Sequence, residues 1–189
     1  MAMTMFGGSC GEEKQVVIPP PLTMTPTPEV VKAVEPTPDA LVLSAGENIP
    51  ARLENVTTEH WLRTLDVNLN SCFELIRAFG PRMVAKGSGR IVAISSCFSF
   101  RGRAGRGPYA ASKAGLNSLV RVAALEYGSG GVLVNAVCPG FVMTDLTRQN
   151  NDEDAIAQLA AGTALGRLGE PEEIAELVAF LVGTTNSYV

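Results

Sequence analysis

Four side chains have types and spacings that could move a proton onto or off a substrate oxygen. Tyr109 and Lys113 stand four residues apart in GPYAASKAG, so on a helix they share one face. Ser96 precedes Tyr109 by thirteen residues, and Asn68 lies in an apolar helical stripe, where a buried amide needs partners. A free phenol titrates near ~10, and a nearby ammonium lowers that pKa. We therefore expect proton transfer coupled to reduction of a carbonyl, or to the reverse, with a cofactor supplying the hydride.

Three short apolar runs alternate with helical segments and end at small or polar residues. The runs are DALVLSAG, RIVAISS and GVLVNAVCPG, and their continuous hydrophobicity indicates burial on both faces. Helices are expected over about 57–86, kinked or divided at Pro81, over about 109–127, and in GEPEEIAELVAFLV. This alternation predicts a Rossmann-type, doubly wound α/β fold with a parallel sheet. Ligands of such sheets lie outside the carboxyl ends of the strands, here SAG, SS and CPG.

Composition favours one globular protein and excludes several kinds of chemistry. The 189 residues are 46% hydrophobic, and a net charge of −4 gives no attraction to nucleic acid or anionic membranes. Four scattered cysteines without a C-x-x-C pair indicate free thiols in a reducing compartment. The single histidine, His60, is expected at the surface, which leaves no metal site and no Ser-His-Asp triad. With neither a signal peptide nor a membrane helix expected, we predict a soluble cytoplasmic protein.

These residues and segments resemble the classical short-chain dehydrogenase/reductase family. The similarity covers about 39–189 and includes Ser96, Y-x-x-x-K, the VNLN segment with Asn68, NAVCPGFVMT and GRLGEPEEIAELVAFLVG. It implies an NAD(P)-dependent oxidoreductase that interconverts a carbonyl and an alcohol, similar to 3-oxoacyl reductases, with NADP slightly preferred over NAD. Tyr109 would then be the acid-base residue, and Lys113 would lower its pKa and hold the nicotinamide ribose. Ser96 would position the substrate oxygen, and Asn68 would anchor a water relay.

The resemblance also assigns cofactor contacts beyond Tyr109 and Lys113. The segment LVLSAG is similar to the family's N-N-A-G, with Leu43 and Ser44 in place of the two asparagines. Near the start, FGGSCGEE keeps a weak version of the glycine-rich phosphate loop, with Glu13 where the last glycine would stand. The expected contacts are Ser44, Ala45, Gly46, Pro139, Gly140, Val142 and Thr144, with Gly7 and Gly11 as weak candidates.

The first 38 residues depart from the family pattern. Seven of the twelve prolines lie between Pro19 and Pro38, so we separate an atypical Pro-rich segment, 1–38, from a catalytic core, 39–189. That segment is a candidate remnant of the cofactor-binding half. No counterpart is evident for the first helix, the second strand, the acidic ribose-binding residue or the final strand. The sequence leaves three explanations open: part of a complete enzyme, a shortened variant, or a degenerate protein that lost its cofactor half.

Two further predictions concern partners and a rival function. The two long helices carry apolar residues on more than one face (Phe73, Leu75, Leu119 and Val122), and the resemblance implies pairing into a homodimer or homotetramer. Arg101, Arg103 and Arg106 lie between Ser96 and Tyr109; they could meet an anionic substrate, although solvated loop charges are the preferred interpretation. The rival to an enzyme is a non-catalytic binding or scaffold protein with the same fold.

Overall fold

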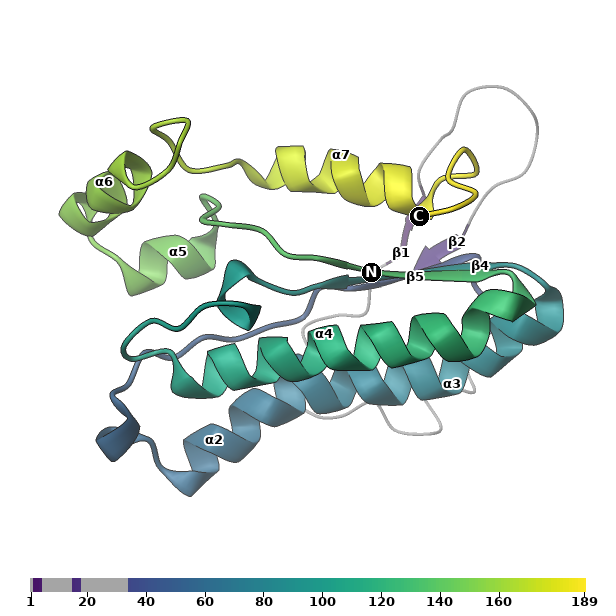
Figure 1. Ribbon diagram of the computed structural model, residues 1–189, viewed down its shortest axis with the longest axis horizontal. Coiled ribbons are helices and arrows are strands. Elements are labelled where there is room, and N and C mark those ends of the chain that lie inside the picture. The colour runs from purple at the N-terminus through teal and green to yellow at the C-terminus, as the bar shows by residue number, and fades with distance from the viewer. Residues whose placement is uncertain (1, 5–14, 18–33) are drawn as a thin grey trace.

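A five-stranded sheet, covered by helices on both faces, forms the centre of the protein (Figure 1). The structure is a computed structural model and describes residues 2–4, 15–17 and 34–189. The strands are β1 (Ala2–Thr4), β2 (Gln15–Val17), β3 (Ala40–Leu43), β4 (Gly89–Ile94) and β5 (Val132–Val137). They follow one another in sequence order, with β1 antiparallel to β2 and the other pairs parallel. The predicted doubly wound parallel sheet is confirmed.

The helices lie where the strand-to-strand crossovers require them. Helix α3 (Ser71–Lys86) and helix α4 (Gly107–Tyr127) cover one face, and α7 (Pro171–Val182) covers the other (Figure 1). Helix α2 (Thr58–Leu65) leads into α3, and the short helices α5 (Asp145–Asn150) and α6 (Glu153–Ala161) lie beyond one end of the sheet. Single 3-10 turns are η1 (Leu53–Asn55), η3 (Cys97–Ser99) and η4 (Gly128–Gly130).

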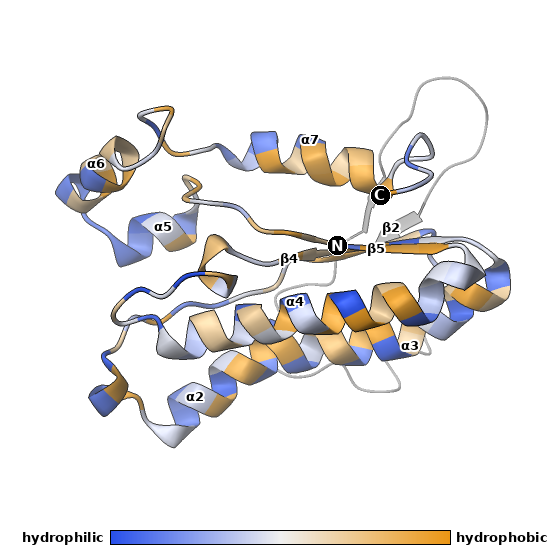
Figure 2. Cartoon of the chain, in the orientation of Figure 1, coloured by the Kyte–Doolittle hydropathy of each residue, from blue (hydrophilic) through white to orange (hydrophobic). Residues whose placement is uncertain are grey.

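The sheet separates two apolar layers, which explains why its strands read as continuous hydrophobic runs. Leu41, Ile91 and Val132 point into the layer beneath α3 and α4 and are fully buried there. Val42 and Val92 point the other way, against Val178 and Leu181 of α7. Figure 2 shows the same pattern in the central strands, which carry the hydrophobic colour. Both faces of the sheet are therefore buried under helices, so polar groups that could bind a ligand or react are expected at the strand ends.

The long helix predicted over 57–86 is interrupted, but not at Pro81. Thr57 caps its start by accepting a hydrogen bond from the backbone N–H of His60 at 3.1 Å. The interruption is a π-helical turn, η2 (Asp66–Asn70), and α3 then continues through Pro81 to Lys86. A π-turn inserts one extra residue into a helix and commonly marks a functional position. The predicted break was therefore placed at the wrong residue.

Helices α5 and α6 were not predicted, although each starts at a recognisable cap. The hydroxyl of Thr144 accepts from the N–H of Thr147, and Asp152 accepts from the N–H of Ala155. Both residues precede acidic first turns, the usual sign of a helix start. The segments are too short to show a clear apolar period, so this signal was missed.

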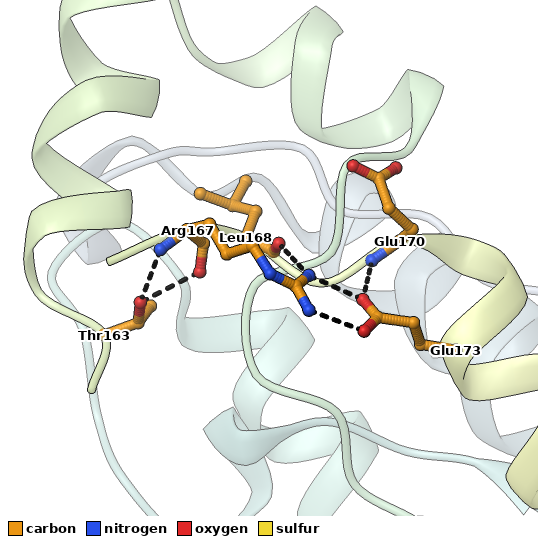
Figure 3. Close-up of polar contacts among 5 residues, drawn as sticks. All are labelled: Thr163, Arg167, Leu168, Glu170 and Glu173. Carbon is orange, nitrogen blue, oxygen red and sulfur yellow. Dashed lines mark hydrogen bonds and ion pairs between the residues drawn. The ribbon is translucent and has the colours of Figure 1, made fainter. Parts of the chain in front are cut away.

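The segment that carries α5 and α6 is fastened to the body at both ends. The N–H of Gly169 donates to the carbonyl of Phe141, and the N–H of Met143 donates to the carbonyl of Gly169. Just after the segment, Arg167 forms a two-pronged ion pair with Glu173 of α7, both N···O distances being 2.7 Å (Figure 3). Glu173 also accepts from the N–H of Glu170 and completes the cap of α7. The segment is thus anchored at its base.

Candidate active site

Tyr109, Lys113 and Ser96 meet at the carboxyl end of β4, as predicted. Ser96 follows that strand and caps η3, its hydroxyl accepting from the N–H of Phe98 at 3.2 Å. Tyr109 lies in the first turn of α4, and Lys113 follows one turn later. The Lys113 ammonium lies 5.8 Å from the centre of the Tyr109 ring and donates to the carbonyl of Ile94 at 2.8 Å. The motif therefore brings a phenol, a hydroxyl and an amine to one strand end.

Lys113 is a deeply buried amine. Only 4% of it is exposed. Burial lowers the pKa of its ammonium from 10.5 to about 8, and the thiols of Cys72 and Cys138 act weakly in the opposite direction. A buried amine with a pKa close to neutrality can hold a proton or release it under mild conditions.

The electrostatics of Tyr109 differ from the sequence prediction. Burial of the phenol raises its pKa above 10.0; the Ser96 hydrogen bond and the charge of Arg106 lower it by less. Lys113 is not among the causes of this shift. The net shift of the Tyr109 pKa is therefore opposite to the expected lowering, because loss of water around the ring outweighs the favourable charges. Lys113, rather than Tyr109, is the group that titrates well below 10.

Asn68 is completely buried within the π-turn, and its amide is used by neighbouring groups. Its Oδ1 accepts from the N–H of Glu47 at 2.8 Å, and its Nδ2 donates to the carbonyl of Glu47 at 2.9 Å and to Ser112 Oγ at 3.0 Å. Ser112 in turn donates to the carbonyl of Tyr109 at 2.8 Å. The amide thus joins the segment after β3 to the catalytic helix. The buried amide therefore has partners, as predicted, and both of its Nδ2 protons are bonded to other groups of the protein.

Sequence reasoning missed Glu47 and Ser112 as the partners of Asn68. Glu47 acts through its backbone, which leaves no trace in residue type. Ser112 could have been found, because it stands directly before Lys113 in the motif and would be buried on the same helix.

The backbone after β3 runs beside the catalytic side chains. A methyl group added to Gly46 would lie 3.5 Å from Lys113 Nζ and 3.6 Å from Asn68 Oδ1. Ser44 and Gly46 are exposed, and Gly140, after β5, is exposed too. These open strand ends, next to a lysine with two uncommitted protons, fit the nicotinamide and ribose end of a dinucleotide. The donor set offers no feature that conflicts with such a cofactor.

The other predicted cofactor residues have structural contacts in the protein. Pro139 accepts from the N–H of Cys97 at 2.9 Å, Val142 bridges to Gly169, and Thr144 caps α5. Their contact with a cofactor stays a prediction. Gly7 and Gly11, the weak phosphate-loop candidates, lie outside the described residues.

The three arginines between Ser96 and Tyr109 do not behave alike. Arg101 and Arg103 are exposed, and both guanidinium groups stack over the ring of Phe141 at 5.8 Å. Arg106 is only 7% exposed. The preferred interpretation of all three as solvated charges thus fits the first two and not the third.

Other features of the described residues limit the chemistry further. In residues 2–4, 15–17 and 34–189, no three His, Cys, Asp or Glu side chains gather into a metal-binding group. Cys72, Cys97 and Cys138 are free thiols. Across the same residues, no helix is both long and apolar enough to cross a membrane.

Comparison with known proteins identifies the family. A family model described as enoyl-(acyl carrier protein) reductase matches residues 26–189. The chain belongs to the short-chain dehydrogenase/reductase family. This membership agrees with the parallel sheet and with the placement of Ser96, Tyr109 and Lys113 at its edge.

Relatives of the chain include reductases and a dehydrogenase. It is 42% identical over 151 residues to the 3-oxoacyl-(acyl-carrier-protein) reductase of Vibrio cholerae, covering 80% of the chain and 62% of that protein. It is 37% identical over 161 residues to the acetoacetyl-CoA reductase of Allochromatium vinosum, covering 85% and 65%. The crystal structure of a putative NAD(P)-dependent gluconate 5-dehydrogenase from Beutenbergia cavernae, with bound NADP, superposes with a TM-score of 0.80 at 38% identity, covering 85% and 64%. The chain thus spans less than two thirds of the length of these three proteins.

Proposed function

We propose that the protein is an NAD(P)-dependent oxidoreductase that interconverts a carbonyl and an alcohol. The observation that carries the proposal is the meeting of Tyr109, Ser96 and Lys113 at the carboxyl end of β4, with the Lys113 ammonium fixed on the Ile94 carbonyl. Family membership supports it, because these residue types stand at the family's spacing.

Each side chain has a role that its environment allows. Tyr109 donates its phenolic proton to the substrate oxygen, and its raised pKa keeps that proton in place until it is needed. Ser96 accepts from a backbone N–H and forms a side-chain hydrogen bond with Tyr109, so its hydroxyl would hold the substrate oxygen beside the proton donor. Asn68 is a positioning residue that ties Glu47 to the catalytic helix through Ser112. A nicotinamide cofactor would supply or accept the hydride.

The cofactor would be held by Lys113 and by the open strand ends. One ammonium proton of Lys113 is committed to Ile94, so two remain for the ribose hydroxyls of NADP or NAD. Gly46 lies beside Lys113, and Ser44, Ala45 and Gly140 are the further strand-end residues that we propose contact the cofactor. NADP is the preferred cofactor of the proposal, supported by the NADP-bound relative from Beutenbergia cavernae.

The relatives suggest the class of substrate. Their names divide into reductases of 3-oxoacyl thioesters and a dehydrogenase of a sugar acid. Both classes carry an oxo or hydroxyl group on the chain of a carboxylic acid or its derivative. We therefore place the substrate among small or medium oxo-acid derivatives. The free thiols are consistent with the cytoplasm as the proposed location.

Titration with NADH and NADPH, followed by fluorescence, tests the proposal against the rival binding or scaffold protein. We expect micromolar affinity for one of the two cofactors. Lys113→Met should weaken it at least tenfold, whereas Lys86→Met, which changes an exposed lysine at the end of α3, should leave it unchanged. Absence of binding up to millimolar concentration would favour the scaffold.

A further inference from the structure

Arg106 is a buried cation that has no carboxylate partner among residues 2–4, 15–17 and 34–189. Its Nη1 is enclosed and has no hydrogen-bond partner in the part of the chain that the structure describes. The side chain is 7% exposed, whereas Arg101 and Arg103 of the same loop are exposed. Burying an ionised group without a partner is costly, and such a group normally pairs with an opposite charge. The missing partner is the feature to explain.

The backbone holds Arg106 firmly beside the catalytic tyrosine. It is the residue before α4 and stands three positions ahead of Tyr109. Its N–H donates to the carbonyl of Arg103 at 3.1 Å, and its carbonyl accepts from Ala110 at 2.8 Å. The neighbouring Gly105 carbonyl accepts from the N–H of Ala51 at 3.1 Å. These bonds fix the backbone from which the Arg106 side chain projects, as a binding site requires.

The charges around Arg106 leave a net positive environment. Besides burial, the groups that affect its pKa are the Arg103 cation, which lowers it, and the Tyr109 phenol, which raises it. No carboxylate is among them. One cation, Arg106, therefore acts on the proton donor of the proposed reaction, and an anion bound to it would offset the cost of its burial.

We propose that Arg106 binds a carboxylate carried by the substrate, so that the enzyme acts on free oxo acids and the corresponding hydroxy acids. This inference rests on the proposed function and names its substrate class. A carboxylate matches a guanidinium because two parallel N–H···O bonds can form. A phosphate bears more charge and loses more hydration on pairing with a buried guanidinium. The closeness of Arg106 to Tyr109 also places the anion near the reacting carbonyl, which disfavours a phosphate at the far end of a long carrier.

Matched acids and esters provide the test. The parent and its variants are assayed with NADPH on 2-, 3-, 4- and 5-oxo acids and on their methyl esters. Arg106→Gln should lower the acid-to-ester ratio of kcat/KM by about 10- to 100-fold for at least one chain length, the loss expected for a charged hydrogen bond. Arg101→Gln and Arg103→Gln, at exposed positions of the same loop, should change that ratio by less than about threefold. If Arg103→Gln lowered the acid-to-ester ratio equally, the preference for acids would come from the general positive charge of the loop, and the proposal would be wrong.

A binding measurement separates this proposal from the proposed function. Acetoacetate should raise the melting temperature of the parent more than methyl acetoacetate does, and Arg106→Gln should abolish the difference. If the parent reduces no carbonyl yet keeps this difference, the anion site stands and the proposed function fails. If the parent reduces carbonyls but the acid-to-ester ratio is unchanged in Arg106→Gln, the anion site fails and the function stands.

Should Arg106→Gln not fold, Arg106→Lys replaces it, with the ratio expected to fall about tenfold. If Arg106→Gln dissociates an oligomer in sedimentation, its partner lies on another copy and the proposal is wrong.

Discussion

Among single residues, Lys113 shows most clearly that a residue needed at the site can lower the stability of the fold. An ammonium at this depth is held by one backbone carbonyl and by its position under the Tyr109 ring. Its lowered pKa shows that the fold tolerates the charge rather than gains from it. The same burial places the amine where the proposed cofactor and the tyrosine meet, so the cost is tied to the site.

The pH dependence of stability tests this assignment. With a pKa of about 8 when folded and 10.5 when unfolded, Lys113 loses its proton first in the folded chain. The unfolded chain then binds more protons between those values, so stability should rise from pH 8 towards pH 10.5. The rise should approach about 2–3 kcal/mol, since one pKa unit corresponds to about 1.4 kcal/mol.

Urea unfolding at pH 7, 8, 9 and 10 measures this contribution as the difference between the parent and Lys113→Met. The parent should gain stability relative to the variant as the pH rises, while Lys86→Met should follow the parent. A constant difference between the parent and Lys113→Met would show that Lys113 keeps an ordinary pKa in the folded protein.

At the scale of the elements, the π-turn η2 matters because it carries Asn68 on the buried side of the helix. The Asn68 amide reaches both Glu47 and Ser112 and so links the segment after β3 to α4. The catalytic helix is positioned by this polar connection as well as by apolar packing.

Asn68→Ala should destabilise the protein by about 3 kcal/mol. The change leaves the backbone groups of Glu47 and the hydroxyl of Ser112 without their buried partner, and each such group costs about 1–3 kcal/mol. Asn70→Ala in the same turn removes one exposed bond to Asp66 and should cost less than about 0.5 kcal/mol. Chemical denaturation of the two variants gives the comparison. Equal effects would mean that the buried amide network does not stabilise the turn.

The ion pair of Arg167 and Glu173 fastens the segment of α5 and α6 to α7. It lowers the pKa of the Glu173 carboxyl from 4.5 to about 2. A depressed carboxyl pKa gives a contribution that is complete above about pH 4.5 and disappears as the pH falls through 2. Both side chains are exposed, so salt should weaken the pair.

Carboxyl NMR titration of Glu173 should show an apparent pKa well below the ordinary value of 4.5, and 1 M NaCl should bring it closer to that value. Arg167→Gln should raise the Glu173 pKa towards 4.5 and speed hydrogen exchange at Gly169. A Glu173 pKa unaffected by Arg167→Gln would contradict the pairing.

At the scale of the whole molecule, several large apolar side chains lie on the surface and do not pack in the core. Phe73 and Val122, two of the four residues expected at an interface, are 44% and 50% exposed, and Leu125 is 85% exposed. The other two differ from the prediction: Leu75 is in the core, and Leu119 is partly buried against it. The exposed residues lie on α3 and α4, which stand side by side in Figure 1.

We predict that the protein forms a dimer or tetramer through these two helices. Sedimentation velocity at micromolar concentration should show the oligomer, and Val122→Glu combined with Leu125→Glu should shift it to monomer, because charges in an apolar contact are costly. Leu165→Glu, also at an exposed leucine but far along the chain from both helices, is the control. A parent that sediments as a monomer would contradict the prediction.

The elements and residues that could be predicted are those that leave a pattern in a short stretch of sequence. The runs at β3, β4 and β5 were recognised from continuous hydrophobicity, and α7 from Pro171 and its acidic first turn. Ser96, Tyr109 and Lys113 were found because their spacing places them at one strand end. The π-turn, the Glu47 and Ser112 contacts of Asn68, and the burial of Arg106 depend on how distant segments pack, which a single sequence does not display. The Tyr109 pKa was misjudged for the same reason, because spacing shows a nearby charge but not the loss of water.

The most direct measurement of the central claim is the rate of NADPH-dependent carbonyl reduction by the parent and by Tyr109→Phe, followed at 340 nm. The substitution keeps the ring and removes only the hydroxyl, so folding and cofactor binding should persist. We expect kcat to fall by about 10²–10⁴, the usual contribution of a general acid-base group. Tyr188→Phe, at a tyrosine that is 94% exposed, should keep the parent rate. A Tyr109→Phe protein that binds NADPH normally and keeps most of the parent rate would show that Tyr109 is not the acid-base residue.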